Sequence, residues 1–476
     1  MGYVVLENAP QSGSISLLYI FMISEVEHQV GAVQSKQTNS LTGSYEAPGD
    51  KSVSHRALML SALCIGESHI FGLLEGDDVL ATADAMRAMG ASVEKVGNGA
   101  NDGKWVVHGV GVGGLSQPAG DIDMGNSGTA VRLLMGLVAS YPMDVRFIGD
   151  ESLCSRPMAW VVEPLKATGA QFTTQDGERL PLTIKGAAVA MPTTYNVPVP
   201  SAQVKSAILL AGLNSAGTTT VVEREATRDH TENMLHAMGA DIKVTELADG
   251  ARQIELRGPA ELRAQDIVVP GDPSSAAFLV VAALITPGSA ITILNVGMNP
   301  LRIGLFDTLL EMGADITLVR ERQAGGEPVA DIEVRYSELH GVSVPAARAP
   351  SMIDEYPVLS IAAAAAVGPT LMEGLAELRV KESDRLAAII DGLEANGIVI
   401  EQGDDWLKVE GTSGEIPGGG KIATHMDHRI AMAFLVMGCC ANAPVTIDED
   451  AMIATSFPSF MEMMSNAGAK FEAVPA

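Results

Sequence analysis

The sequence predicts an α/β fold built from six similar repeats, and two observations carry that prediction. A glycine that ends a helix and precedes a strand recurs at intervals of 70 to 84 residues, at Gly90, Gly169, Gly239, Gly313, Gly397 and Gly468. Glycine suits this position because the left-handed conformation that ends a helix creates no clash for it. A strongly apolar helix comes before each of these glycines. Six copies of such a pair indicate a chain organised by repetition.

The six apolar helices are predicted to be buried. They are expected at residues 52–63, 127–139, 201–213, 273–285, 353–367 and 427–439. Residues 207–211 and 361–367 are apolar on every face, which is typical of a helix with no side toward solvent. Their polar starts recur at the same period, at Gly49, Asn126, Ser201, Asp272, Asp354 and Asp427. Each repeat then adds an amphipathic helix and several short strands.

Two of the polar starts are near duplicates and divide the chain. The tripeptide Pro-Gly-Asp stands at residues 48–50 and again at 270–272. We therefore expect two similar domains of three repeats, one from residues 51–269 and one from 41–50 plus 270–476. The chain would cross between them twice, which makes a natural hinge and places the site in the inter-domain cleft. Residues 1–40 match no repeat and are expected to be a loose extension, or translation upstream of a start at Met22.

Composition excludes several classes of partner. The 476 residues contain 31 Lys and Arg against 58 Asp and Glu, a net charge of −27, which disfavours nucleic acid. No membrane span is expected, because the longest uncharged stretch, 276–301, is interrupted by Thr-Pro-Gly at 286–288. The four cysteines, Cys64, Cys154, Cys439 and Cys440, have no metal-binding or redox spacing. They are expected to be reduced, as in a cytoplasmic protein.

Basic residues gather at helix starts although the chain has few of them. They are Lys51, Arg56, Arg132, Arg156, Lys205, Arg228, Lys381, Arg385 and Arg429. A helix N-terminus binds anions through its free N–H groups and its partial positive charge, whereas a cation there opposes the dipole. If the starts face one cleft, they form a trap for phosphate and carboxylate. The alternative is that each cation balances neighbouring carboxylates, as within Lys-Glu-Ser-Asp-Arg at 381–385.

Five motifs carry a resemblance to a known family. They are Pro-Gly-Asp-Lys-Ser-Val-Ser-His-Arg at 48–56, Gly-Asn-Ser-Gly-Thr at 125–129, Ser-Ala-Gln-Val-Lys-Ser at 201–206, Lys-Glu-Ser-Asp-Arg at 381–385 and Asp-His-Arg at 427–429. In order and spacing they resemble 5-enolpyruvylshikimate-3-phosphate synthase, from about residue 41 to the C-terminus. Thr-Arg-Asp-His at 227–230 and residues 351–357 are similar to the class II branch. The implied fold is α/β with two similar domains, each of three βαβαββ repeats, the inside-out α/β barrel of the enolpyruvyl transferases.

The resemblance also implies a reaction. It is the transfer of the enolpyruvyl group of phosphoenolpyruvate to the 5-hydroxyl of shikimate-3-phosphate with release of phosphate, in the shikimate pathway of aromatic amino acid and chorismate biosynthesis. Both partners are small molecules, and the family needs no metal or organic cofactor, acts as a monomer and is the target of the herbicide glyphosate. A tetrahedral intermediate forms by addition and collapses by elimination. One group must therefore deprotonate the hydroxyl and another must protonate the methylene carbon.

Matching the motifs residue by residue assigns a site. For shikimate-3-phosphate the matched residues are Lys51, Ser52, Arg56, Ser201, Ala202, Gln203, Arg228, Asp354 and Lys381. For phosphoenolpyruvate they are Lys51, Asn126, Gly128, Arg156, Gln203, Arg385 and Arg429. Asp354 matches the base, Glu382 the proton donor, and Lys51 completes the catalytic set. Glu355 matches no role and is expected to cap a helix. Thr-Ser-Phe-Pro at 455–458 stands where class I members carry a Lys, so a contact made by that Lys must be absent or replaced.

Two alternative functions remain to be tested against this one. UDP-N-acetylglucosamine enolpyruvyl transferase shares the fold and the donor, but its first helix carries a Lys-Asn pair where this chain has Lys51-Ser52. Its reactive Cys before an Arg-Pro has a counterpart in Cys154, at a different spacing. The other alternative is a non-catalytic repeat scaffold that binds anions. The presence of Asp354, Glu382 and Lys51 argues against it.

Overall fold

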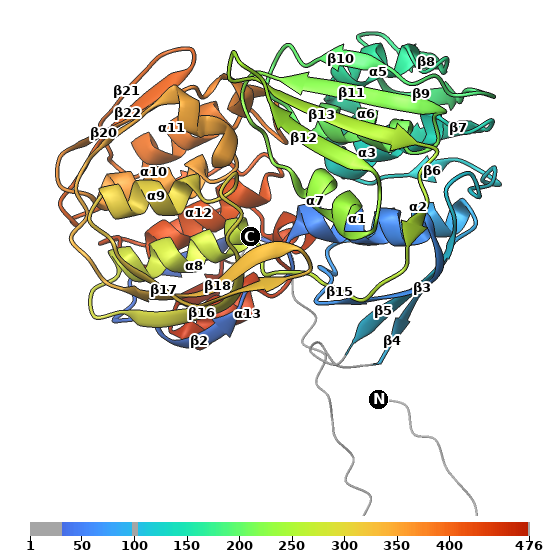
Figure 1. The fold of residues 1–476 in the computed structure, drawn as a ribbon. Helices are drawn as coiled ribbons and strands as arrows, with labels where there is room; N and C mark the ends of the chain where they lie inside the picture. The colour runs from blue at the N-terminus through green and yellow to red at the C-terminus, as the bar shows by residue number, and fades with distance from the viewer. Residues whose placement is uncertain (1–30, 98–102, 475–476) are drawn as a thin grey trace, which may run out of the picture. The chain divides into compact units, whose positions relative to one another are not determined.

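The computed structural model describes residues 31–97 and 103–474, and these form six β-sheets that correspond to the six repeats (Figure 1). In each sheet one strand pairs in parallel with the strand that follows the buried helix, and that strand pairs antiparallel with the last strand of the repeat. The order β6-β7-β9-β8 shows the pattern. The repetition predicted from the glycines is thus a repetition of whole sheet-and-helix units.

The first three repeats run from α1 to β15. Repeat one contains α1 (Lys51–Ala62), β3 (Cys64–Phe71), α2 (Asp77–Ala88), β4 (Ser92–Val96) and β5 (Lys104–Val110), joined by β14 (Leu262–Arg263) and β15 (Ile267–Val268). Repeat two contains β6 (Ile122–Asp123), α3 (Gly128–Ala139), β7 (Asp144–Ile148), α4 (Glu151–Ser155), α5 (Ala159–Lys166), β8 (Gln171–Gln175) and β9 (Arg179–Lys185). Repeat three contains β10 (Thr194–Asn196), α6 (Ala202–Gly212), β11 (Gly217–Glu223), α7 (His230–Ala237), β12 (Ile242–Glu246) and β13 (Arg252–Gly258).

The last three repeats take two strands from the start of the described chain. Repeat four contains β2 (Thr42–Glu46), α8 (Pro273–Ile285), β16 (Ala290–Gly297), α9 (Gly304–Glu311), β17 (Asp315–Ala324) and β18 (Glu327–Arg335). Repeat five contains β19 (Ser343–Val344), the 3₁₀ helix η1 (Ala346–Ser351), α10 (Tyr356–Ala365), β20 (Pro369–Glu373), η2 (Ala376–Val380), α11 (Arg385–Ala395), β21 (Ile400–Gln402) and β22 (Trp406–Glu410). Repeat six contains β23 (Lys421–Ile422), α12 (His428–Gly438), β24 (Val445–Ile447), η3 (Ala451–Thr455), α13 (Phe460–Ala467), β25 (Lys470–Ala473) and β1 (Val33–Lys36).

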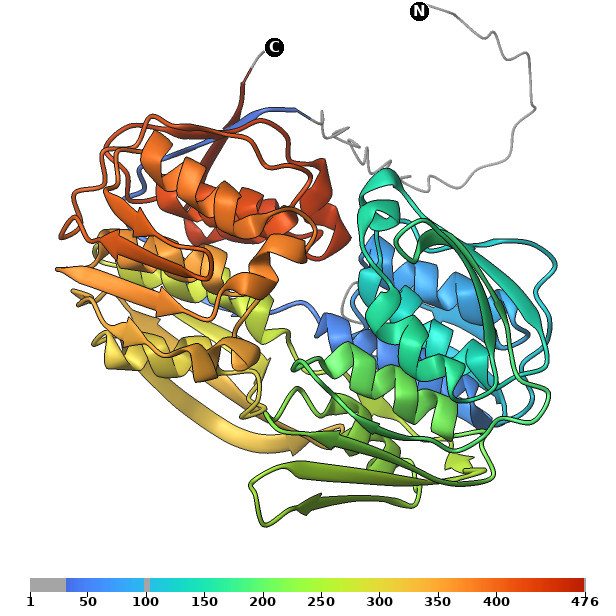
Figure 2. The ribbon, with the colours of Figure 1, turned by 90° about the horizontal axis from the view of Figure 1, so that it is seen from above.

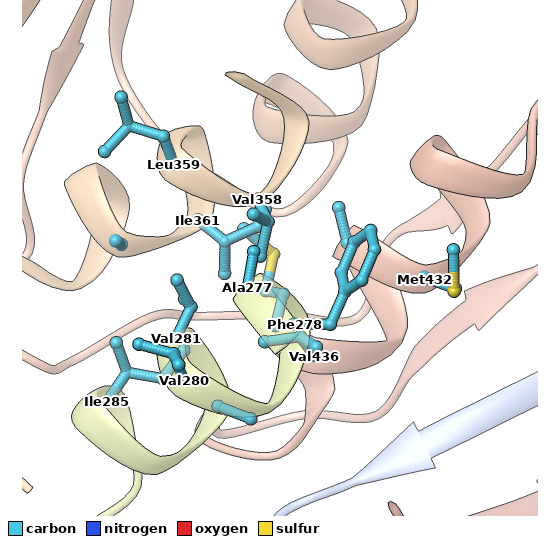
Figure 3. Close-up of a cluster of buried hydrophobic side chains, with 14 of the residues drawn as sticks. Ala277, Phe278, Val280, Val281, Ile285, Val358, Leu359, Ile361, Met432 and Val436 are labelled. Atoms are coloured by element: carbon cyan, nitrogen blue, oxygen red, sulfur yellow. The ribbon is translucent and has the colours of Figure 1, made fainter. Parts of the chain in front are cut away.

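The repeats pack around two separate hydrophobic cores. One core is formed only by residues between Val53 and Val269, and the other by residues 33–47 together with 276–469. We call the elements around them the first lobe (α1 to β15) and the second lobe (β1, β2 and α8 to β25). Figure 2 shows the blue-to-green elements of the first lobe beside the yellow-to-red elements of the second. Figure 3 shows the second core, where Phe278 of α8, Ile361 of α10 and Val436 of α12 converge.

The six glycines behave as the sequence predicts. Each has a positive φ, from +78° at Gly397 to +122° at Gly468. The apolar helices are buried as expected, and α8 is buried along its whole length. The largest difference in bounds is at α10, which begins at Tyr356 rather than near residue 353, because η1 and a turn occupy the residues before it. Asp354 therefore lies in the turn that leads into the helix.

The prediction that residues 1–40 form a loose extension was wrong for residues 33–36. These residues form β1, which pairs with both β24 and β25. The sixth repeat has no last strand of its own in the described chain, so β1 occupies that position and supplies the missing backbone partners. Val33 and Leu41 are buried in the second core. The remainder of the expected extension, residues 1–30, lies outside the described part of the chain.

The two Pro-Gly-Asp segments lie side by side where the chain passes between the lobes. The Asp50 backbone N–H donates to the Pro270 carbonyl, and the Asp272 N–H donates to the Pro48 carbonyl, both at 2.7 Å. Arg302 lies between these segments, with Nη2 3.2 Å from Asp272 Oδ1 and Nη1 3.9 Å from Asp50 Oδ2. The duplicated motif is therefore one paired connection.

Close packing of the buried helices gives a stability prediction. A Cβ added at Gly136 of α3 would stand 2.2 Å from the Ala207 carbonyl oxygen and 2.7 Å from Ala207 Cα on α6. Backbone atoms in a packed helix cannot move aside, so Gly136→Ala should destabilise the first lobe by about 1–3 kcal/mol. Urea unfolding should show a lower midpoint. Gly120→Ala, where an added Cβ meets nothing within 4 Å, is the control, and equal midpoints for the two variants would contradict this packing.

Within residues 31–97 and 103–474, no helix combines the length and the apolarity needed to cross a membrane.

Candidate active site

The first turns of the six buried helices face one cleft between the two lobes. Its wall includes Lys51 and Ser52 of α1, Gly128 and Thr129 of α3, Ser201 to Gln203 at α6, Asp272 before α8, Asp354 before α10, and His428 and Arg429 of α12. Side chains cap five of these helices at their N-termini, namely Asp50, Ser127, Ser201, Asp272 and Asp427. Six helix N-termini aimed at one space make it a site for anions.

The charge of the cleft is opposite to that of the whole chain. Eight of the lining residues are Lys or Arg and five are Asp or Glu, although the chain as a whole has 31 basic and 58 acidic residues. The eight cations are Lys51, Arg56, Arg132, Arg156, Arg228, Arg302, Lys381 and Arg429. They come from both lobes, so a ligand in the cleft meets positive charge from two sides.

The third repeat binds the side chain of Arg56 and contributes Arg228 to the cleft. The Arg56 guanidinium donates to Thr231 Oγ1 and Ser206 Oγ, both at 2.7 Å, and to the Ser52 carbonyl at 3.0 Å. Burial lowers the pKa of Arg56 to about 10, which leaves it charged at neutral pH. Arg228 reaches across to the second lobe, where its Nη2 donates to Asp354 Oδ2 at 2.6 Å.

A second group of side chains surrounds the first turn of α3. Arg156 Nη2 donates to Asn126 Oδ1 at 2.6 Å and to Ser152 Oγ at 2.9 Å, while its Nε is buried without a partner. Arg132 Nη1 donates to Gln203 Oε1 at 2.9 Å. Gly128 keeps these arginines close, because a Cβ there would stand 3.0 Å from Arg156 Nη1 and 3.1 Å from Arg132 Nη1.

Asp354 lies among cations in the second lobe. Its Oδ1 accepts from Arg385 Nη1 at 3.2 Å, and Lys381 Nζ is 3.8 Å away. Burial by itself would raise the pKa of the Asp354 carboxyl. Four surrounding cations outweigh burial and hold this pKa well below its usual range; they are Lys381, Arg228, Arg429 and Arg385. Asp354 is therefore an ionised acceptor at the cleft wall.

Glu382 lines the same wall and is bound to Arg385 Nη2. Burial would raise the pKa of this carboxyl too, but nearby cations again dominate and hold it well below the usual value; they are Arg385, Arg156 and Lys51. Its backbone carbonyl accepts from Ser152 Oγ of the first lobe at 3.4 Å. Glu382 thus stands where the two lobes meet.

The structure places most of the matched residues on the cleft but sets two behind it. Asn126 and Arg385 are not part of the lining. Asn126 acts on the cleft through Arg156. Arg385 is fully buried and joins three carboxylates, those of Asp427 (Nε to Oδ2, 2.7 Å), Asp354 and Glu382. Its guanidinium fixes both candidate catalytic carboxylates in one arrangement.

Two expectations about single residues need correction. Lys205, grouped with the cations of the anion trap, is fully buried and does not line the cleft. Glu355, expected to cap α10, makes no capping hydrogen bond, because its Oε1 instead accepts from Ser274 Oγ at the start of α8. The partners of Lys205 come from later elements of its own repeat and the partner of Glu355 from the neighbouring repeat, and sequence spacing reveals neither.

Several lining residues escaped the motif comparison. Arg132 was among the recurring cations, but the motif comparison assigned it to neither substrate. Its position one turn after Gly128 indicates the same helix face. Arg302 and Asp78 also line the cleft without any sequence signal, and His230, part of the motif at 227–230, lines it although it was assigned no role. Lys51 Nζ pairs with Asp78, and Thr455 Oγ1 lies 3.5 Å from His428 Nδ1. Thr455 itself does not line the cleft.

No cluster of three or more His, Cys, Asp or Glu that could hold a metal ion occurs among the residues that the structure describes. All four cysteines are free thiols, and Cys64, Cys439 and Cys440 are buried.

Known proteins are similar in sequence to this chain along most of its length. A family model described as EPSP synthase (3-phosphoshikimate 1-carboxyvinyltransferase) matches residues 35–464. A 3-phosphoshikimate 1-carboxyvinyltransferase of Parvibaculum lavamentivorans is 58% identical over 450 residues, covering 94% of this chain and 99% of that protein. A protein of the same name from Paramagnetospirillum magneticum is 59% identical over 439 residues, covering 92% and 97%.

Solved structures agree with the sequence relatives. EPSP synthase from Acinetobacter baumannii superposes with a TM-score of 0.82 at 44% identity, covering 94% of this chain and 100% of that one. The enolpyruvyl transferase NikO from Streptomyces tendae gives a TM-score of 0.71 at 18% identity and the same coverage, which shows the shared fold alone. The expected α/β fold of repeated units, the inside-out barrel of the enolpyruvyl transferases, is thereby confirmed. The chain belongs to the EPSP synthase family.

Proposed function

We propose that this cleft transfers the enolpyruvyl group of phosphoenolpyruvate to the 5-hydroxyl of shikimate-3-phosphate and releases phosphate. The observation that carries the proposal is the meeting of six helix N-termini and eight cations at one cleft that also contains two carboxylates of opposite chemical use. Each substrate has one phosphate and one carboxylate, so both need what the cleft offers. Relatives at 58% and 59% identity carry the name of this activity.

The first lobe provides most of the groups assigned to shikimate-3-phosphate. Lys51, Ser52 and Arg56 lie at the start of α1, and Ser201, Ala202 and Gln203 lie at the start of α6. Arg228 stands between them and the second lobe. Asp354 and Lys381 then face this group from the second lobe. A sugar-like ring held by the first lobe would therefore present its hydroxyl to Asp354.

Phosphoenolpyruvate is assigned to a second set of lining residues, with arginines from both lobes. Arg156 and Gly128 come from the first lobe and Arg429 from the second, with Lys51 and Gln203 shared between the two substrates. Planar guanidinium groups suit carboxylate and phosphate because both can be bound through two parallel hydrogen bonds. Asn126, outside the lining, orients Arg156, and Arg385 holds the carboxylates of Asp354 and Glu382.

Asp354 and Glu382 are the proposed acid–base groups. Asp354 accepts the proton of the 5-hydroxyl as that oxygen attacks C2 of phosphoenolpyruvate, and Glu382 delivers a proton to the methylene carbon to form the tetrahedral intermediate. Elimination then breaks the bond from C2 to the phosphate oxygen, and a methyl proton is removed to restore the double bond. Lys51, which lies near both substrate groups, stabilises the phosphate that leaves.

The deciding assay measures phosphate release with each substrate alone and with both together. Release is expected only with both, together with formation of enolpyruvylshikimate-3-phosphate. Replacing shikimate-3-phosphate by UDP-N-acetylglucosamine tests the alternative transferase, and turnover of that acceptor would refute the proposal. Binding of both substrates without any turnover would favour the non-catalytic scaffold.

The position of Gly128 predicts a selective response to glyphosate. Glyphosate is a phosphonate that competes for the phosphoenolpyruvate site in this family and is longer than the substrate. In Gly128→Ala the new methyl would press on the tips of Arg156 and Arg132, which can move by tenths of an ångström. The substrate should tolerate that shift better than the longer inhibitor. We expect the inhibition constant to rise about 10- to 100-fold, the range of an overpacked contact, and the Michaelis constant for phosphoenolpyruvate to rise much less.

Steady-state kinetics of the two proteins, with glyphosate competing against phosphoenolpyruvate, measure both constants. Gly120→Ala, which has open space for its methyl, is the matched control. Equal inhibition constants for wild type and Gly128→Ala would refute the steric argument. An insensitive wild type would show that contacts other than Gly128 already exclude the inhibitor.

A further inference from the structure

Lys205 is a fully buried lysine beside the cleft that the reaction does not use. It lies in the first turn of α6, directly after residues assigned to the substrate, yet its side chain has no solvent exposure. Its ammonium contacts three oxygens: Glu223 Oε1 at 3.0 Å, Glu232 Oε1 at 2.8 Å and the Thr227 carbonyl at 3.0 Å. The ammonium donates hydrogen bonds to Glu223 and to the Thr227 carbonyl, and its contact with Glu232 is an ion pair. Lysine is almost never buried completely without such partners.

The contact with Thr227 fixes a short connection at the cleft. Residues 224–229 join β11 to α7, and Thr227 is held there twice. Its carbonyl accepts from Lys205, and its hydroxyl donates to Glu223 Oε2 at 2.7 Å. The next residue is Arg228, which lines the cleft and donates to Asp354 across the lobes. Lys205 thus holds the peptide from which Arg228 extends.

The same turn of α6 also orders the other arginine of this group. Ser206, the neighbour of Lys205, accepts from Arg56 Nη2 and lies 2.7 Å from Thr231 Oγ1. Thr231 accepts from Arg56 Nε and precedes Glu232, the second carboxylate on Lys205. Two consecutive residues of α6 therefore act on the two arginines assigned to shikimate-3-phosphate.

Stability alone is a weak reason for this arrangement. Apolar side chains of similar volume often replace buried ion pairs without loss of stability, because desolvation offsets the attraction between the charges. Glu223 by itself balances the charge of Lys205, while burial raises the pKa of Glu232, so the lysine adds little to the positive field of the cleft. What an apolar residue could not provide is a donor to the Thr227 carbonyl.

We propose that Lys205 is a positioning residue for shikimate-3-phosphate, which holds Thr227 so that Arg228 meets the substrate and Asp354. This inference rests on the proposed function and extends it to a residue outside the cleft wall. Without the ammonium, the 224–229 connection would gain freedom, and Arg228 would have to be ordered when the substrate binds. Affinity for shikimate-3-phosphate would then fall.

The test is a double-mutant cycle on binding of shikimate-3-phosphate, measured by titration calorimetry without phosphoenolpyruvate. Lys205→Met/Glu232→Gln removes one charge of each sign, and Glu232→Gln alone is its matched control because it keeps the ammonium. The dissociation constant of the double variant should exceed that of the control by about tenfold or more, the effect of a lost charge-assisted contact. The Michaelis constant for phosphoenolpyruvate should stay within about twofold.

The cycle is completed in an Arg228→Met background. If Lys205 acts through Arg228, its removal there should change the dissociation constant by less than about twofold. Thermal unfolding shows that each variant is folded, and Lys205→Gln, too short to reach three acceptors, replaces the double variant if that one does not fold. An unchanged dissociation constant, or an equal loss in both backgrounds, would overturn the inference. A wild type that binds no shikimate-3-phosphate would instead refute the proposed function, and the inference with it.

Discussion

Replacing Asp354 by Asn should leave a folded chain that binds shikimate-3-phosphate and turns over about 10²- to 10⁴-fold more slowly, the usual contribution of a positioned base. Asn keeps the size of the side chain and one acceptor oxygen, so the contact with Arg228 can persist. It cannot take up the proton of the 5-hydroxyl. The Michaelis constants should change far less than the turnover number.

The electrostatics of Asp354 explain both its role and its pH behaviour. Its pKa is below the usual value because cations surround it, although burial opposes them. A carboxyl with a lowered pKa contributes stability above its ordinary pKa, near 3.8, and that contribution is lost as pH falls through the lowered value. The acid limb of kcat/KM above pH 4, which reports the free enzyme, should therefore belong to another group. Anionic substrates that neutralise the surrounding cations would raise this pKa and make Asp354 a stronger base.

Glu355→Gln provides the matched control, because it removes one carboxylate charge at the next residue. Glu355 is more deeply buried than Asp354, accepts from Ser274 and lies 3.7 Å from Arg429. Its loss should cost less than about tenfold in turnover, the effect of one hydrogen bond. Near wild-type turnover of Asp354→Asn, with the shikimate-3-phosphate affinity retained, would remove Asp354 from the role of base.

The sequence predicted the repetition of this fold because its signals are local. A glycine with positive φ at a helix end and a strongly apolar helix are properties of a few consecutive residues, and all six of each appear in the structure. Strand β1 was missed for the opposite reason. It has only four residues, and it belongs to a sheet whose other strands lie near the C-terminus. Nothing within residues 33–36 indicates which distant edge they complete.

The same difference between local signals and distant contacts applies to the candidate site. Motifs identified residues at helix starts, and 13 of the 15 assigned residues line the cleft. The local sequence could not tell which cations face the ligand and which face a carboxylate. Lys381 stands among acidic residues in the sequence and yet lines the cleft, whereas Lys205 has no acidic neighbour in the sequence and is buried against two carboxylates. Arg302 was invisible because its partners, Asp50 and Asp272, are brought to it by the paired connection between the lobes.

Glu382→Gln should produce the second large effect, a loss of turnover of about 10²- to 10⁴-fold through failure to protonate the methylene carbon. The structure indicates that Glu382 must first gain a proton before it can fill this role. The pKa of Glu382 is held well below its usual value by Arg385, Arg156 and Lys51, against the effect of burial. In the ligand-free state the carboxyl is therefore ionised at neutral pH and has no proton to donate.

Phosphoenolpyruvate can remove that obstacle. Its phosphate and carboxylate would neutralise the same cations, Arg156 and Lys51 among them, that lower the pKa of Glu382. Burial would then dominate and favour the protonated carboxyl. Formation of the complex with shikimate-3-phosphate and glyphosate, which cannot react, should accordingly take up a proton. Calorimetry in two buffers with different ionisation enthalpies measures that uptake, and Glu382→Gln should reduce it.

Solvent deuterium provides the chemical test of the same residue. In D₂O the wild type should place deuterium in the methyl group of the tetrahedral intermediate, and the rate of incorporation should fall in Glu382→Gln along with turnover. Ser383→Ala is the control, since Ser383 Oγ lies 3.1 Å from Asp427 Oδ2 and is outside the cleft lining. Unchanged deuterium incorporation in Glu382→Gln would assign the proton to another group. If Glu382→Gln slows deuterium incorporation but leaves the proton uptake on complex formation unchanged, Glu382 is already protonated before phosphoenolpyruvate binds. The cations around it would then be screened in solution.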